Sequence, residues 1–248
     1  MTGKKQGRRS AEAAENTRQQ IMQVATDLFC EFGYARVSLR MISEKAQISH
    51  SLIRHHFGSK EQIWYSISDI LHECIDQYGL NILDSLPESL KVDERIYQFM
   101  VRILAFTLVY KKPIQLMADV VRHEGERFDY FVDRTGEVEH SINKLTTLYN
   151  QKYPDNQVKF WEIKWQMIMF AHGAASLSPF LMKTWGNECE TEAGCLMKHW
   201  QMYNNLMAEQ FRIPARSRLN PASLDELIIK DGFCCPYQSL SCYPGENL

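Results

Sequence analysis

Two short helical segments separated by a tight turn, residues 39–46 and 50–57, constrain the fold of this chain more than any other feature. Each segment follows a serine, Ser38 or Ser49, at the position where a side-chain oxygen caps the first turn of a helix. Gly58 then stands where a glycine is expected just after a helix ends. Such a pair, when braced by a longer helix, makes a helix-turn-helix unit.

Longer helical patterns flank this pair on both sides. Apolar residues recur with helical spacing over 21–32, and capping-box sequences at 17–20 and 59–62 mark the starts of the first and last helices. Residues 1–15 are polar and basic, which predicts a mobile arm. The sequence therefore predicts a helix-turn-helix domain over residues 16–62.

The rest of the chain is also predicted to be helical, and no run alternates apolar and polar residues as a strand would. We expect an all-α protein in which the three-helix domain is followed by a larger helical bundle over 63–212. Residues 213–248 contain four prolines and predict an irregular tail of unknown role, with one short helix at 223–230. In the bundle, helical segments are expected at 94–110, 114–123, 126–150, 157–184 and 193–212.

Composition narrows the class of protein. The chain has 248 residues, enough for a small domain and a larger one, and no stretch approaches the roughly 18 apolar residues that span a bilayer. The N-terminus lacks the apolar core of a secretory signal. Seven cysteines at irregular spacings are typical of a reducing compartment rather than a disulfide scaffold. We therefore expect a cytoplasmic protein with no membrane contact.

Charge is distributed unevenly along the chain. Residues 1–60 hold ten basic and five acidic residues, although the whole chain has a formal net charge of −2. A basic first quarter joined to an acidic remainder suggests a polyanion-binding region attached to a part with another task. Ordinary scatter of solvated charge is the alternative interpretation.

Histidines and cysteines raise the alternative of a metal or catalytic site. His50, His55 and His56 lack the i, i+4 spacing of metal-binding pairs, and no acidic or thiol partner is near them in sequence. Cys195 and His199 have that spacing, but one pair is a weak signal, and the three cysteines of the tail are less regular still. No glycine-rich phosphate loop or Gly-x-Ser-x-Gly motif occurs. We expect neither an enzyme nor a bound metal or cofactor.

Four short motifs carry a family likeness. They are Phe32-Gly33-Tyr34 at the end of the first helix, the capped 38–46 helix, Ser49-x-Ser51-Leu52-Ile53-x-His55-His56-Phe57, and Ser59-Lys60-Glu61. Through them residues 17–71 resemble the DNA-binding domain of TetR-type transcriptional repressors. Two positions depart from the family pattern, which usually has glycine where Gln47 stands and tyrosine where Arg54 stands. Arg54 keeps a polar tip suited to phosphate, and Gln47 can adopt the turn conformation with some strain.

The resemblance implies that the start of the second short helix faces base edges in the major groove, while flanking groups bind phosphates. His50 and Ser51 are the candidates for base contacts, and Arg40 can reach a guanine edge or a phosphate. His56 is equally compatible with a packed core position, and Arg54 with a solvated surface charge. The expected DNA interface consists of Ser38, Arg40, Gln47, Ser49, His50, Ser51, Arg54, His55 and Lys60.

The resemblance also implies an effector pocket and a homodimer interface in the bundle. The small residues Gly173-Ala174-Ala175 would allow two helices to approach closely. Aromatic and methionine stripes suggest an apolar effector, although such stripes are also typical of ordinary core. The pocket candidates are Phe99, Phe106, Met117, Trp165 and Met169 for the lining, with Asp119, Arg122, His123 and His172 as polar anchors.

Two functions from different classes remain open at this point. The first is a repressor that binds a palindromic double-stranded operator as a homodimer and is released by a small, largely apolar effector. The second is a helical adaptor whose basic N-terminal region binds an acidic protein or RNA. A preference for duplex DNA over single-stranded RNA discriminates between them.

Overall fold

The computed structural model describes the backbone of residues 4–121, 125–132 and 136–229. Within these ranges every regular element is a helix, which confirms the predicted all-α class. None of the described helices is both long and apolar enough to cross a membrane. The α-helices are α1 (Lys4–Phe32), α2 (Leu39–Ala46), α3 (His50–Phe57), α4 (Lys60–Ser85), α5 (Val92–Val109), α6 (Lys112–Val120), α7 (Glu126–Val132), α8 (Glu137–Lys152), α9 (Phe160–Ser176), α10 (Ser178–Trp185) and α11 (Glu192–Gln210), with 3-10 turns η1 (Tyr34–Arg36), η2 (Pro154–Asn156), η3 (Ala215–Ser217) and η4 (Leu224–Leu227).

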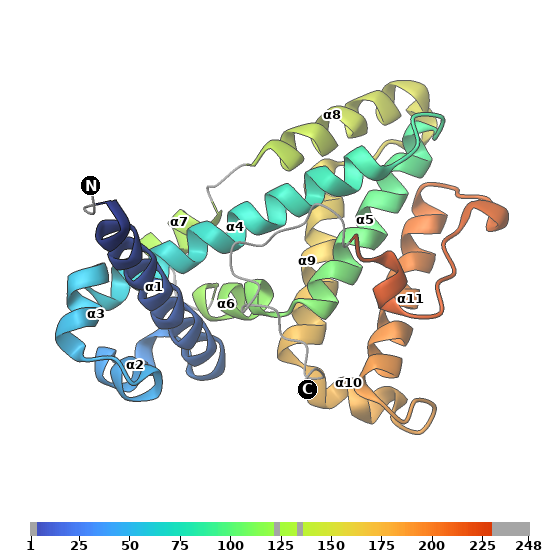
Figure 1. Cartoon of the computed structure of the whole chain (residues 1–248). Coiled ribbons are helices and arrows are strands. Elements are labelled where there is room, and N and C mark those ends of the chain that lie inside the picture. The colour runs from blue at the N-terminus through green and yellow to red at the C-terminus, as the bar shows by residue number, and fades with distance from the viewer. Residues whose placement is uncertain (1–3, 122–124, 133–135, 230–248) are drawn as a thin grey trace.

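The N-terminal helices form a small unit, which we call the head: α1, α2, α3 and the first half of α4. Fully buried side chains from each of these helices make its core, including Ile21, Ile42, Ile53 and Trp64. Figure 1 shows α4 running from this unit into the larger group of helices. The predicted domain boundary between residues 62 and 63 falls inside α4, whose buried side chains belong to the head core as far as Leu71.

The first helix is longer than the sequence predicted. It begins at Lys4, so residues 4–15 are helical where a mobile arm was expected. Thr17 does not cap the helix, because its hydroxyl donates to the carbonyl oxygen of Ala13 one turn earlier (2.9 Å). Residues 11–15 are all alanine or glutamate, which favour helix and outweigh the capping-box pattern behind them.

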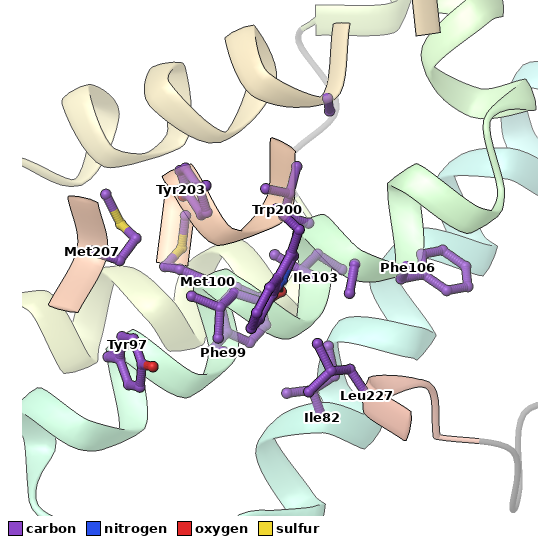
Figure 2. Close-up of a cluster of buried hydrophobic side chains, with 14 of the residues drawn as sticks. Ile82, Tyr97, Phe99, Met100, Ile103, Phe106, Trp200, Tyr203, Met207 and Leu227 are labelled. Atoms are coloured by element: carbon purple, nitrogen blue, oxygen red, sulfur yellow. Dashed lines mark hydrogen bonds between the residues drawn. The ribbon is translucent and has the colours of Figure 1, made fainter. Parts of the chain in front are cut away.

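The second half of α4, together with α8, α9 and α11, packs against α5, and with α10 these helices form the body. α5 buries side chains around its whole circumference, as a central helix does. Trp200 and Tyr203 of α11 pack into the same cluster, which Figure 2 shows. The Trp200 indole N–H donates to the carbonyl oxygen of Val101 (2.8 Å), and the Tyr97 hydroxyl donates to the side-chain oxygen of Asn204 (2.6 Å). These buried hydrogen bonds fix the register of α11 against α5.

Two segments that the sequence predicted as single helices are each divided in two. The stretch 126–150 becomes α7 and α8, and the stretch 157–184 becomes α9 and α10. The Asp76 carboxylate accepts the first two amides of α8 (3.2 and 3.0 Å) and approaches Gly136 too closely for a β-carbon there. Pro179 stands at the start of α10, where its fixed φ and missing N–H favour a new helix.

The segment that follows α11, residues 213–229, is irregular as predicted but packs firmly against the body. Leu224 and Leu227 of η4 are buried in the body core. A 3-10 turn at 224–227 replaces the short helix predicted at 223–230. Residues 230–248, which include all three tail cysteines, lie outside the described part of the chain.

α6 connects the two units. Leu116 and Val120 are buried in the head core, whereas Ile114 is buried in the body core. The helix packs against α1 and α4 on one side and against α9 on the other. A movement of α6 relative to the body would therefore be transmitted directly to α1.

Candidate nucleic-acid interface

The two short helices of the head are fixed by hydrogen bonds at their first turns. Ser38 Oγ accepts the Met41 amide (3.2 Å) and Ser49 Oγ accepts the Leu52 amide (3.3 Å), so both predicted caps are confirmed. Between the helices, Gln47 adopts the left-handed conformation (φ 55°, ψ 34°). A residue with a β-carbon is strained there, which is why glycine commonly occupies such a position.

Side-chain hydrogen bonds brace the strained turn. The Ser43 hydroxyl donates to the carbonyl oxygen of Ile48 (2.6 Å). The Gln20 amide of α1 donates to the carbonyl oxygen of Ala46 (2.9 Å), which ties the end of α2 to the first helix. The turn is therefore held from both sides, and α3 has a fixed direction relative to α1.

α3 has one buried side and one exposed polar side. Ile53 is fully buried and Phe57 is nearly so, with the Arg18 guanidinium 4.5 Å from the centre of the Phe57 ring. His50 and Ser51, in the first turn, are exposed. The helix rests on the head by its apolar side and presents a short, polar first turn to solvent, which is the arrangement that major-groove contact requires.

The flanking residues of the predicted interface are also at the surface. Ser38, Arg54 and His55 are exposed. Arg40 is exposed too, but its guanidinium pairs with the Glu44 carboxylate one turn later on α2 (2.8 Å). Leu52, although apolar, is 39% exposed on the same helix as Arg54 and His55. An Arg40 that contacts DNA must exchange its carboxylate partner for a base or a phosphate.

Lys60 has a different environment from the other predicted phosphate ligands. Its ammonium donates to the carbonyl oxygens of Tyr34 and Val37 (2.8 Å each) and lies 4.0 Å from the centre of the Tyr34 ring. Burial, followed by the nearby Arg127 charge, lowers the pKa of Lys60 below its usual range. The geometry therefore favours a structural role, in which Lys60 holds the turn between α1 and α2.

The contacts that join the head to α6 were missed by sequence reasoning. The Asp119 carboxylate accepts the Tyr34 amide (2.8 Å), and Lys112 pairs with Asp27 (2.9 Å) from a side chain that is 8% exposed. Gly33, with φ 77°, lies so close to Asp119 that a β-carbon there would come within 2.6 Å of the carboxylate. Gly33 is the one feature of the sequence that could have indicated this close contact. Tyr34 and Asp119 are about 85 residues apart, and no sequence pattern reveals a contact over that distance.

A family model and several known proteins match this part of the chain. The model described as "Bacterial regulatory proteins, tetR family" matches residues 21–64. The HTH-type transcriptional repressor Rv3405c of Mycobacterium tuberculosis is 43% identical over 51 residues, 21% of this chain and 27% of that protein. The HTH-type transcriptional regulator TtgR of Pseudomonas putida is 38% identical over 69 residues, 28% of this chain and 33% of that protein.

Residues 21–64 therefore carry the sequence pattern of the TetR family. The match spans about a quarter to a third of the length of these curated relatives. The structure of a Clostridium perfringens regulator extends the likeness of fold beyond the head. It covers 78% of this chain and 97% of its own, with a TM-score of 0.58 and 13% sequence identity. The family consists of regulatory proteins rather than enzymes.

Those predicted effector-pocket residues that the structure describes are not gathered in one place. Trp165 and Met169 are exposed on α9, while Phe99 and Phe106 are buried in the body core. Asp119 is bonded to the head, as described above. Of the remaining candidates, Met117 is partly buried against the body core, His172 lies within hydrogen-bond distance of Ser176, and Arg122 and His123 fall outside the described residues.

The i, i+4 pair on α11 is used for packing in this structure. His199 lies 2.8 Å from the carbonyl oxygen of Phe170 through Nε2, and burial lowers its pKa. The Cys195 thiol is directed at the carbonyl oxygen of Cys189 (3.9 Å). Among the described residues, no group of three or more potential ligands is placed to hold a metal ion.

Proposed function

We propose that this protein is a DNA-binding transcriptional regulator that reads an operator with the first turn of α3. The observation that carries the proposal is the exposed polar start of α3, Ser49-His50-Ser51, on a helix locked to the head by Ile53 and Phe57. Short side chains allow a helix to approach base edges closely, and all three can form hydrogen bonds there. The net positive charge of residues 1–60 favours approach to a polyanion.

Each residue of the interface has a proposed task. His50 and Ser51 contact base edges, and Arg40 contacts a base or a phosphate after leaving Glu44. Ser38, Arg54 and His55 position the DNA backbone, which fixes the docking register without reading the sequence. Gln47 and Lys60 act indirectly, because they set the turns that orient the two short helices.

A homodimer is the second part of the proposal. Trp161, Trp165 and Met169 form an i, i+4, i+8 row on α9, and they are 65%, 60% and 46% exposed. A single exposed apolar side chain is ordinary, but a row of large ones on one helix marks an interaction surface. A β-carbon on Gly173, one turn further, would have no atom of the described residues within 4 Å, so this small residue leaves room for a close helical neighbour.

Two further helices extend this apolar surface. Phe180 of α10 is 67% exposed, and Met202 and Leu206 form an i, i+4 pair of exposed apolar residues on α11. α10 and α11 pack against each other and against α9. We call six exposed apolar residues of these three helices the apolar surface: Trp161, Trp165, Met169, Phe180, Met202 and Leu206. A two-fold dimer through it would place two heads on a palindromic operator.

Release by a small, largely apolar effector completes the proposal. The ligand must bind one head arrangement better than the other, since equal affinity for both would shift nothing. The connection through α6 supports this coupling, because Asp27–Lys112 and Tyr34–Asp119 join the head to a helix that also packs on the body. Repression is the direction of regulation that we propose.

A gel-shift titration tests the proposal. The protein is titrated against the duplex DNA upstream of its own gene, an unrelated duplex of equal length, and single-stranded RNA at moderate salt. The proposal expects the upstream duplex to bind about a thousandfold more tightly than the unrelated one. Equal binding to RNA and duplex, or capture of an acidic protein without DNA binding, would instead favour the adaptor function.

A further inference from the structure

The C-terminal segment 213–229 is attached to the body by its main chain. The Leu219 amide donates to the Tyr97 hydroxyl (2.8 Å), and the Ile229 amide donates to the Tyr78 hydroxyl (3.1 Å). Between these two points Leu227 inserts its side chain into the body core, 4% exposed, and Figure 2 shows it beside Ile82. The segment therefore lies across α4 and α5, and Leu227 is one of the side chains that it buries in the body core.

Arg102 of α5 lies beneath this segment, and no carboxylate of the described residues is paired with it. Its Nη1 donates to the carbonyl oxygen of Leu227 at 3.5 Å, the limit of a hydrogen bond. Its Nε is buried and has no acceptor. The charged or ionisable groups that influence it are Tyr78 and Tyr97, and within the described ranges no carboxylate pairs with it. Burial lowers the pKa of Arg102.

The Arg102 guanidinium uses little of its capacity to donate hydrogen bonds within the described part of the chain. It carries five N–H donors in a planar fork that matches a carboxylate, whereas a single long bond to a main-chain carbonyl uses one of them. Removing a charge from water costs free energy unless a partner and hydrogen bonds compensate. The position is therefore a candidate for an external anion rather than for a contact that stabilises the fold.

The surroundings of Arg102 are apolar and aromatic. Tyr78 and Phe106 stack with ring centres 3.8 Å apart, and Ile82 is fully buried in the same cluster. Leu227 comes from the irregular segment 213–229 rather than from one of the α-helices of the body. A ligand could therefore replace it without unfolding a helix of the body.

We propose that Arg102 and the C-terminal segment form a binding site for an organic acid, in which the guanidinium takes the carboxylate and the apolar part replaces Leu227 against Tyr78, Ile82 and Phe106. The segment 213–229 acts as a built-in competitor that closes the site when the acid is absent. This inference rests on the proposed regulatory function, since it names the class of effector and the element that responds to it.

The test measures binding of octanoate to the full-length protein by calorimetry, without DNA. Leu227→Ala removes the competing side chain and is expected to tighten octanoate binding roughly tenfold. In that background Arg102→Gln is expected to weaken octanoate binding by roughly tenfold or more, because a charge-assisted bidentate contact is lost. Octan-1-ol, which has the same chain without the charge, should bind equally with or without the guanidinium.

Arg95→Gln in the Leu227→Ala background is the matched control. Arg95 lies two turns earlier on α5 and also donates to main-chain carbonyl oxygens, those of Leu83 and Pro87 (3.3 and 3.4 Å). This change should leave octanoate affinity within about twofold. Equal octanoate affinity with and without Arg102, or an equal effect of Arg102→Gln on octan-1-ol, would overturn the proposal.

Thermal unfolding without ligand distinguishes a binding role of Arg102 from a structural role, and it requires no DNA. If Arg102 serves ligand binding, Arg102→Met should leave the melting temperature equal or raise it, because the substitution removes a poorly paired, partly buried charge. A lowered melting temperature together with unchanged octanoate affinity would show a structural role instead. If octanoate binds as expected but never changes operator affinity, the site stands and the proposed regulation fails.

Discussion

The first turn of α3 and the apolar surface on α9–α11 are both exposed, yet they differ in chemistry. The α3 surface offers hydroxyls, histidines and Arg54, each small or flexible and already solvated. The apolar surface offers two tryptophans on one helix, with most of each indole in water. The polar α3 surface is stable in contact with water. Covering the apolar surface lowers the free energy, because apolar side chains leave water.

Because of this difference, DNA binding and dimerisation should respond differently to salt. Contacts with phosphate release counterions, so DNA affinity falls steeply as salt rises. Burial of apolar surface does not depend on ion release and is strengthened by excluded salts such as sulfate. A dimer held by the apolar surface should therefore persist at salt concentrations that dissociate the DNA.

The largest expected effect comes from charging the apolar surface. Trp165→Glu places a carboxylate at the centre of the α9 row, which would be buried without a partner in a dimer. We expect the dimer dissociation constant to rise at least about a hundredfold, as measured by sedimentation equilibrium. Operator affinity should fall with it, because two linked heads bind a palindrome more tightly than one.

A matched control exists on a different helix. Leu148 of α8 is 46% exposed and lies outside the apolar surface, so Leu148→Glu should leave the dimer unchanged. A Trp165→Glu protein that remains dimeric would place the interface elsewhere. Equal loss of dimer in both variants would point to general destabilisation.

The next effect distinguishes two basic residues of the head. Lys60→Ala leaves two main-chain carbonyls without their donor, so we expect the free energy of unfolding to fall by about 1–3 kcal/mol in urea titrations. Arg54→Ala should leave stability unchanged and reduce the slope of log affinity against log salt by about one. A reduced salt slope in Lys60→Ala instead would restore the phosphate role predicted from sequence.

A third effect concerns sequence preference. His50→Ala should narrow the affinity difference between the preferred operator and single-base variants by roughly tenfold at one position in each half-site. Its affinity for unrelated duplex should stay the same, because phosphate contacts supply that binding. Competition titrations with single-base operator variants measure both quantities, and a uniform loss for every duplex would assign His50 to the backbone.

The smallest effect is a pH dependence of stability that arises in the body. Burial lowers the pKa of His199 in the folded protein, although its contact with the Phe170 carbonyl oxygen acts against this. Between the lowered pKa and the unfolded value of about 6.5, the unfolded chain binds a proton that the folded chain does not. Stability should therefore fall as the pH falls through this window.

Urea midpoints at pH 7.5 and pH 5.5 measure this dependence. His199→Gln should have a smaller difference between the two midpoints than the wild type, since its side chain does not titrate. The same difference in both proteins would assign the pH dependence to other groups.

Much of the head was predictable because its signals are local. Ser38, Ser49 and Ser59 act as caps within three residues of their partners, and Gly58 ends α3 where the pattern placed it. Gln47 also took the left-handed turn that was expected of it. Such features depend on a few neighbouring residues, so the sequence alone is sufficient to locate them.

Sequence reasoning missed the contacts that join distant parts of the chain. Asp119 had the polar character of an effector anchor, but the Tyr34 amide of the head binds it. Lys60 had the position of a phosphate ligand, but its ammonium donates to the carbonyl oxygens of Tyr34 and Val37 in the turn after α1. Trp165 and Met169 had the spacing of a core stripe and lie at the surface. Helical periodicity shows which residues share a face, but not what covers that face.

Selection from a pool of random DNA duplexes by the wild-type protein tests the central claim most directly. If α3 reads the major groove as part of a two-fold dimer, the enriched sequences will be palindromic, with half-site centres about 34–36 Å apart or a multiple of that. Enrichment of an asymmetric single site would contradict the dimer on the operator. No enrichment over the starting pool would contradict the account of α3 as a reading helix.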